Sequence, residues 1–255
     1  MKERQKKILS GFGGRGDRIM SNLVRSVSMV GILIMLFILG FLVTNGMPVL
    51  RESALSEIFL SRDWYPVEEP PALGMLPLIA GTLSATLLSS LIALPIAVAL
   101  AIFTAEIAPR RLRSFFKVMM ELMGFLPSIV LGFIGMMVLA PWLQNKLNIA
   151  TGLNLVNASI LLGFLVIPVV ASLSEEALSA VPQELRDASY ALGATRWETT
   201  RRVVVPHALS GITAAALLGV MRALGETMVV LMAAGGAAII PAMLTDPVRP
   251  LTATI

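Results

Sequence analysis

The stretch EEALSAVPQELRDASYALGATRWETTRRVVVP, residues Glu175–Pro206, is a long polar interval in the otherwise apolar C-terminal part of this sequence. Acidic residues come first and basic residues follow, an order that suits the dipoles of short helices. Several small residues precede Gly193, which permits a turn or a close backbone approach. Apolar, helix-forming sequence lies on both sides. The stretch therefore predicts a short helix–turn–helix at a membrane surface, with its small-residue side open to a partner.

The composition of the whole chain places this loop in a membrane protein. The chain has 255 residues, of which 56% are hydrophobic and 14% are charged, and its mean hydropathy is +0.82. Soluble domains carry about 25% charged residues, so we expect an all-α integral membrane protein. Cysteine is absent and histidine occurs once. Neither a thiol nucleophile nor a metal site is therefore expected, and no catalytic residue is predicted.

Charge-free apolar runs predict the spans. A helix needs about 20 apolar residues to cross the hydrocarbon core of a bilayer, and about five segments of this chain qualify. They are expected at roughly 26–50, 70–105, 115–142, 156–173 and 206–234. Residues 1–25 form a basic tail before the first span, and residues 26–255 form one transmembrane domain.

The distribution of lysine and arginine sets the expected topology. Basic residues gather in the N-terminal tail, at 110–117 and at 186–202, whereas the loops at 45–73, 143–155 and 237–250 carry few. Loops rich in lysine and arginine stay on the cytoplasmic side. The N-terminus and the 175–206 loop are therefore both predicted to be cytoplasmic.

Part of the polar stretch also matches a known signature. DASYALG (Asp187–Gly193), followed after a spacer by VVVP (Val203–Pro206), resembles the "EAA" loop of bacterial ABC-importer permeases. The resemblance implies that this loop docks into a cleft of a cytoplasmic ATPase and transmits its closure to the pore. An ordinary cytosolic loop between two spans is the alternative. The coupling residues implied by the resemblance are Glu184, Asp187, Ala188, Ser189, Ala191, Gly193, Ala194 and Arg196.

Other segments narrow the resemblance. Gly74–Arg113, Gly124–Pro141 and Arg222–Gly235 resemble the phosphate-uptake permeases, and FLSRDWYP (Phe59–Pro66) favours the PstC-type subunit over the PstA-type. The resemblance implies a type I ABC-importer helix bundle that moves inorganic phosphate across a bacterial or archaeal inner or plasma membrane. The implied partners are a PstA-type permease, two PstB-type ATPase subunits and a periplasmic or lipid-anchored phosphate-binding protein. ATP and magnesium are expected on the ATPase subunits, and no cofactor is expected on this chain.

Several alternatives and one further expectation remain open. The same architecture could carry another oxyanion, such as molybdate or sulfate, or the chain could be an ion-coupled secondary transporter. The chain lacks the G-x-x-x-x-G-K-[ST] motif, so it is not expected to hydrolyse nucleotides itself, and no nucleic acid partner is expected. The family resemblance implies a sixth span, and the chain stops at Ile255 without a polar tail. We therefore expect a truncated product or fragment that transports poorly.

Arg222 and Glu226 are a charged pair inside the last predicted span. Their i, i+4 spacing puts them on one helix face, and Arg222 lies roughly 24 Å along a helix that begins at Pro206. Charges at such depth usually face a bundle interior or a water path, and the fork of a guanidinium suits a tetrahedral oxyanion. Both residues are therefore substrate-path candidates. A salt bridge that only fixes packing is the alternative.

Overall fold

The computed structural model describes residues 15–52 and 54–254, which fall into two units, Met1–Leu55 and Ser56–Ile255. The first unit consists mainly of one long helix, α2 (Arg15–Gly46), followed by the short α3 (Val49–Glu52). Its segment Ile19–Gly46 is long and apolar enough to cross a membrane, which confirms the first predicted span. The helix already begins at Arg15, inside the predicted basic tail, and residues 1–14 lie outside the described part.

The second unit begins with a small ordered region in what the sequence predicts to be a loop. After α4 (Leu55–Leu60), strands β1 (Trp64–Tyr65) and β2 (Ala72–Leu73) pair antiparallel, with Trp64 opposite Leu73. Gly74 follows directly, and a Cβ on it would lie 2.5 Å from the Ser61 carbonyl oxygen. The glycine therefore lets the hairpin close against the end of α4.

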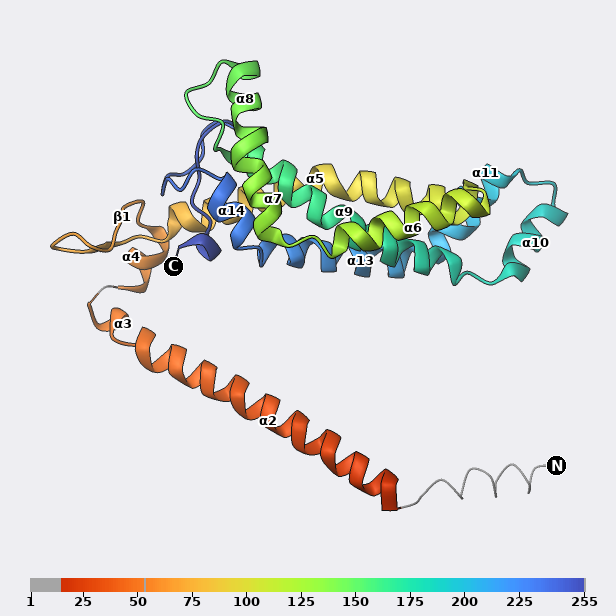
Figure 1. The fold of residues 1–255 in the computed structure, drawn as a ribbon, viewed down its shortest axis with the longest axis horizontal. Helices are drawn as coiled ribbons and strands as arrows, with labels where there is room; N and C mark the ends of the chain where they lie inside the picture. The colour runs from red at the N-terminus through yellow and green to blue at the C-terminus, as the bar shows by residue number, and fades with distance from the viewer. Residues whose placement is uncertain (1–14, 53, 255) are drawn as a thin grey trace. The chain divides into compact units, whose positions relative to one another are not determined.

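Three helices run side by side along the second unit (Figure 1): α5 (Leu76–Ile102), α9 (Leu155–Ser179) and α13 (Leu209–Leu224). The central helix is α9. In its most apolar stretch 67% of the residues are buried, against 33% in the corresponding stretch of the span that contains α5. Small side chains permit this close approach. Four buried alanines of α5 share this role: Ala85, Ala93, Ala97 and Ala101. The second and fourth predicted spans are therefore confirmed, at Leu76–Ile107 and Leu155–Ser179.

The third predicted span, 115–142, is wrong as a single helix. The chain forms α6 (Arg110–Gly124), α7 (Ser128–Ile134), the π-helical η2 (Gly135–Leu139) and α8 (Ala140–Leu147). Figure 1 shows α6 running along the bundle, whereas α7 and α8 turn away from it. The break falls before Pro127, which lacks an N–H and disfavours helical backbone in the residue before it. The membrane-length helix in this region is Ser128–Leu147.

The last predicted span, 206–234, is also interrupted. Its pieces are α12 (Val205–His207), α13 and α14 (Met228–Ala233), with breaks at Ala208 and at Gly225–Thr227. The helical segments on either side of Ala208 are bent by 67°. In the described residues four helices could cross a membrane, or up to five if this bent pair is one span. The estimate of about five spans therefore agrees with the upper count.

Buried asparagines fix the start of α9. The Asn154 side chain accepts a hydrogen bond from the Asn157 backbone amide at 3.0 Å and so caps the helix. Asn157 Nδ2 donates to the carbonyl oxygens of Gly135 and Gly152, each at 3.1 Å. These bonds tie α9 to η2 and to the loop after α8.

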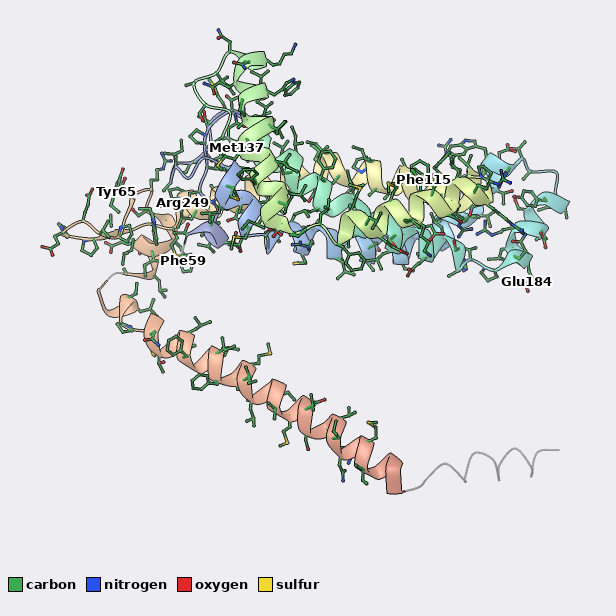
Figure 2. The ribbon with its side chains drawn as sticks, viewed as in Figure 1. Phe59, Tyr65, Phe115, Met137, Glu184 and Arg249 are labelled. Carbon is green, nitrogen blue, oxygen red and sulfur yellow. The ribbon has the colours of Figure 1, made fainter. Side chains whose placement is uncertain are left out.

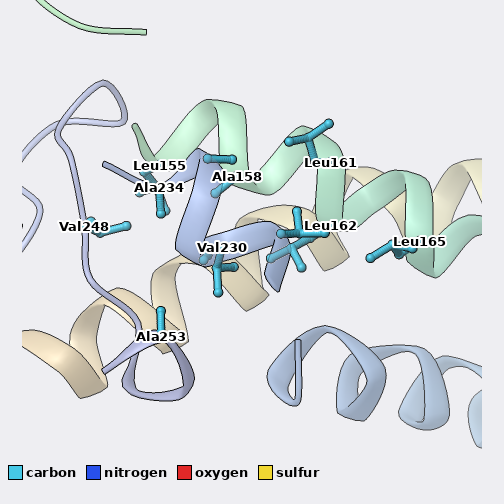
Figure 3. Packing of buried hydrophobic residues seen from close by; sticks show 12 residues of the cluster. Leu155, Ala158, Leu161, Leu162, Leu165, Val230, Ala234, Val248 and Ala253 are labelled. Carbon is cyan, nitrogen blue, oxygen red and sulfur yellow. The ribbon is translucent and has the colours of Figure 1, made fainter. Parts of the chain in front are cut away.

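The chain's last described residues belong to the core. Figure 3 shows Val248 and Ala253 in the same apolar cluster as Leu155 of α9 and Val230 and Ala234 near α14. A backbone bridge joins Gly235 to Val248, and the short 3-10 helix η4 (Leu251–Ala253) follows. The sequence predicts only a loop and the start of an apolar segment here, so this packing was not foreseen.

The polar loop and the hairpin lie at opposite ends of the second unit (Figure 2). Figure 2 shows Glu184 of α10 (Gln183–Ala191) at one end, and Phe59, Tyr65 and Arg249 at the opposite end. The polar 175–206 loop is therefore separated by the length of the bundle from the hairpin and the C-terminal segment.

The contact between α9 and α13 predicts a strong effect of one added methyl group. A Cβ on Gly219 would lie 2.3 Å from Val170 Cγ2 and 3.0 Å from Val166 Cγ1. Gly219→Ala should therefore lower the free energy of unfolding by about 1–3 kcal/mol, as overpacking does. Thermal unfolding of the purified chain in detergent measures the effect.

The matched control for this substitution is Gly31→Ala on α2, where no atom lies within 4 Å of the added carbon. It gains the same helix propensity without a clash, so the unfolding temperature should stay the same or rise slightly. Adding Val170→Ala to Gly219→Ala removes the nearer of the two clashing methyl groups and should recover part of the loss. A Gly219→Ala chain as stable as its parent would contradict the close packing of α9 against α13.

Candidate functional site

The polar loop folds as the sequence predicts. After α9 ends at Ser179, the chain forms α10, turns at Gly193, and continues through α11 (Arg196–Thr199) and the π-helical η3 (Thr200–Val204). The turn requires glycine, because φ at Gly193 is +83°. The predicted helix–turn–helix is therefore confirmed as a structure.

A capping box begins the second helix of the loop. The Thr195 side chain accepts from the Glu198 backbone amide, and the Glu198 carboxylate accepts from the Thr195 amide at 2.9 Å. Hydrogen bonds from the Thr195 backbone and hydroxyl lower the pKa of the exposed Glu198 carboxyl. The capping box thus satisfies two backbone amides at the start of α11 and marks where this helix begins.

One half of the loop is anchored and the other is open. Thr199, Thr200 and Val204 are buried, whereas no residue of α10 is buried. Ala188 and Ala191 are exposed, and a Cβ on Gly193 would meet no atom within 4 Å. The small-residue side of α10 is therefore free to receive another surface.

A concave surface lies between the two helices of the loop. A cavity of about 350 Å³ is lined by residues of both helices and their turn, among them Ser189, Gly193, Ala194 and Glu198. Ser189 Oγ and Thr199 Oγ1 lie 2.9 Å apart and connect the two helices beside it. Five predicted coupling residues thus cluster around the turn: Ala188, Ser189, Ala191, Gly193 and Ala194.

The other three predicted coupling residues are placed differently. Glu184 lies in the first turn of α10, and Asp187 Oδ1 accepts a hydrogen bond from Gln183 Nε2 at 3.0 Å. Arg196 lines a second cavity of about 570 Å³, between α10 and the ends of the spans, together with Arg113 and Arg186. The predicted set therefore covers two faces of the loop rather than one.

The pair Arg222–Glu226 forms, but not on a continuous helix. Arg222 is in the last turn of α13, Gly225 ends that helix, and Glu226 lies in the break before α14. Arg222 Nη1 lies 2.5 Å from Glu226 Oε2, and the Arg222 side chain is 43% exposed whereas that of Glu226 is 5% exposed. The second carboxylate oxygen accepts from the Val229 amide at 3.5 Å. A half-exposed guanidinium at a helix break could meet an anion while its buried carboxylate holds it in place.

The sequence reasoning missed two ion pairs that join distant segments. Arg113 of α6 pairs with Glu175 of α9, and Arg186 of α10 pairs with Glu106 in the π-helical η1 (Phe103–Ile107) that continues α5. Both glutamates are buried. The available signal was their position: each carboxylate lies at the end of an apolar run, where a charge needs a partner.

Comparison with known proteins finds close relatives. The sequence model of the family described as "Binding-protein-dependent transport system inner membrane component" matches residues 97–249. A Bacillus subtilis protein named "Probable ABC transporter permease protein YqgH" is 37% identical over 255 residues, covering 99% of this chain and 80% of that protein. The "Phosphate transport system permease protein PstC" of Mesorhizobium japonicum is 34% identical over 214 residues, covering 76% of this chain and 65% of that protein.

A solved structure shares the fold. One chain of "Inward facing conformations of the MetNI methionine ABC transporter" superimposes with a TM-score of 0.52 at 25% identity, covering 62% of this chain and 74% of that chain. The type I importer bundle predicted from the sequence is therefore confirmed, as is the resemblance to the phosphate permeases.

The asymmetric burial of Arg222 and Glu226 predicts asymmetric stability effects. Arg222→Gln leaves a buried carboxylate without its cation, whereas Glu226→Gln leaves a guanidinium that is 43% exposed and reaches water. Breaking a fully buried pair costs about 3–5 kcal/mol. Glu226→Gln should cost less than Arg222→Gln, because the guanidinium that it leaves unpaired is partly exposed. Unfolding temperatures of both variants and of the double variant measure the difference. Equal losses from the two single variants would contradict the asymmetry.

Proposed function

The chain belongs to the family of binding-protein-dependent transport system inner membrane components, and from this premise we propose that it is the PstC-type permease subunit of an ATP-driven phosphate importer. The proposal that the substrate is phosphate rests on the 34% identity with a phosphate permease over 76% of the chain. Two features of the structure support the mechanism: a loop with one open face, and a guanidinium at a helix break.

The open face of the 175–206 loop is proposed to dock on an ATPase subunit. Docking needs an accessible surface, and the side formed by Ala188, Ala191 and Gly193, with the exposed Leu192 beside them, provides one. The partners proposed for the complex are a PstA-type permease, two PstB-type ATPase subunits and a phosphate-binding protein outside the membrane. ATP binding would draw the loops together and open the pathway outward, and hydrolysis would return it. This orientation places the N-terminus and the loop in the cytoplasm, in agreement with the distribution of basic residues.

Arg222 is proposed to contact the phosphate on its path. Its guanidinium can donate two parallel hydrogen bonds to a tetrahedral oxyanion, and it is half-exposed within an apolar segment. Glu226 would orient the guanidinium between substrates and partly neutralise it. The Thr252 hydroxyl donates to the Glu226 carbonyl at 2.8 Å, so the C-terminal segment also steadies this break.

Transport by the reconstituted complex tests the function. Vesicles that contain the complex assembled around this chain should accumulate labelled phosphate when ATP is supplied on the loop side, and not without ATP. The name of the Bacillus subtilis relative specifies no substrate, so sulfate and molybdate belong in the same assay. Uptake of either in preference to phosphate would overturn the substrate, and uptake independent of ATP would overturn the importer class.

The same assay separates substrate contact from a structural role at Arg222. Arg222→Lys keeps the charge but loses the fork, and should lose most of the uptake per folded complex if the guanidinium binds phosphate. Glu226→Gln should be less harmful, because Arg222 can still meet the anion. If the double neutral variant recovers full uptake together with abundance, the pair serves only packing.

The docking proposal predicts that bulk, rather than backbone strain, is harmful at Gly193. Gly193→Ala and Gly193→Trp share the cost of a side chain at φ +83°, about 1–3 kcal/mol, but only tryptophan fills the docking face. Gly193→Trp should abolish ATP-driven uptake while leaving the chain in the membrane, and Gly193→Ala should keep much of it. Normal assembly and full uptake in the tryptophan variant would refute docking at this face.

A further inference from the structure

Arg186 connects the open helix of the loop to two membrane-spanning helices. Its Nη1 lies 2.6 Å and 2.7 Å from the two carboxylate oxygens of Glu106. Its Nη2 donates to the Leu178 carbonyl at 2.9 Å. Glu106 lies in η1, which continues α5, and Leu178 lies in the last turn of α9. One side chain of α10 therefore holds the ends of both helices.

Little else fastens α10 to the bundle. No residue of α10 is buried, so the helix has no apolar anchor. Its other described side-chain bonds stay within the loop, Gln183 to Asp187 and Ser189 to Thr199. Within residues 15–52 and 54–254, the hydrogen bonds and ion pairs that tie α10 to the spans are those of Arg186.

The contact is built to persist when the loop moves. The side chains of Arg186 and Glu106 are 11% and 6% exposed, so water and salt screen the pair weakly. A guanidinium beside the last carbonyls of α9 also interacts favourably with that helix dipole. Separating the two residues would leave the buried Glu106 carboxylate without its cation, which is costly. Displacing α10 should therefore displace the ends of α5 and α9 before the contact breaks.

Glu106 lies at a point where the helix can change shape. It is in a π-helical turn, in which the Ala108 amide bonds back to the Phe103 carbonyl at 2.8 Å. Such turns occur inside α-helices, frequently at functional sites. A force applied at Glu106 thus acts on the irregular end of α5.

We propose that the contact of Arg186 with Glu106 and the Leu178 carbonyl is the positioning link that carries motion of α10 to the spans. The inference rests on the proposed function, since it assumes that a partner moves α10. It goes beyond that function by naming residues outside the docking face that carry the motion of α10 to the spans. Arg186 acts through Glu106 and α9, and it touches no substrate.

The experiment uses the assembled complex and measures labelled phosphate taken up per ATP hydrolysed. The variants are Arg186→Met, Glu106→Gln and the double variant, with Arg111→Gln as control. Arg111 is an exposed arginine of α6 for which the described residues show no ion pair. Arg186→Met should lower uptake per ATP about fivefold or more, the lower end of typical coupling between sites. Arg111→Gln should retain the parent ratio.

The double variant separates transmission from stability. It removes both charges, so abundance and unfolding temperature should return toward those of the parent. Uptake per ATP should stay low, because the link is still absent. Recovery of both quantities in the double variant would overturn the proposal, and so would an unchanged ratio in Arg186→Met.

A distance measurement decides the link without reference to the substrate. The chain contains no cysteine, so spin labels at Leu185→Cys and Ile107→Cys report the separation of α10 from η1. ATP binding should leave this distance unchanged in the parent and change it in Arg186→Met. A change of equal size in both would overturn the link. A parent complex that moves no phosphate would contradict the proposed function, while the label distances would still decide the link.

Discussion

A buried carboxylate in an apolar bundle needs a cation, and this requirement shapes the second unit. Three glutamates, Glu106, Glu175 and Glu226, have side chains no more than 6% exposed, and each lies against one arginine. Leaving any of them unpaired would cost several kcal/mol. All three lie where a helix ends or is interrupted. The ion pairs therefore stabilise the points at which the chain leaves regular helix.

The same requirement applies to the backbone, because lipid offers no hydrogen-bond partner to an interrupted helix. At the break after α13, the Glu226 carbonyl accepts from Thr252 and its side chain accepts from the Val229 amide. At the start of α9, Asn157 binds two glycine carbonyls of neighbouring segments. Polar side chains inside the bundle thus supply hydrogen bonds at the places where regular helix is interrupted.

The features predicted correctly from the sequence depend on local patterns. The apolar runs identify α2, α5 and α9, and the i, i+4 spacing identifies Arg222–Glu226, since both signals lie within one segment. The breaks in the third and last predicted spans were missed, because a broken apolar segment has the same hydropathy as a continuous one. The pair Arg186–Glu106 was missed for another reason. Its partners lie in segments that only the packing of α5 against α9 brings together.

The two halves of the polar loop differ in how firmly they are packed against the bundle. The second half is part of the bundle, since Thr199, Thr200 and Val204 are buried and Val204 belongs to the cluster that contains Leu178. The first half, α10, has no buried residue. A partner that displaces the loop would therefore move α10 more readily than η3. Because α10 is bonded to the bundle through Arg186, its displacement is directed to the ends of α5 and α9 rather than lost in the loop.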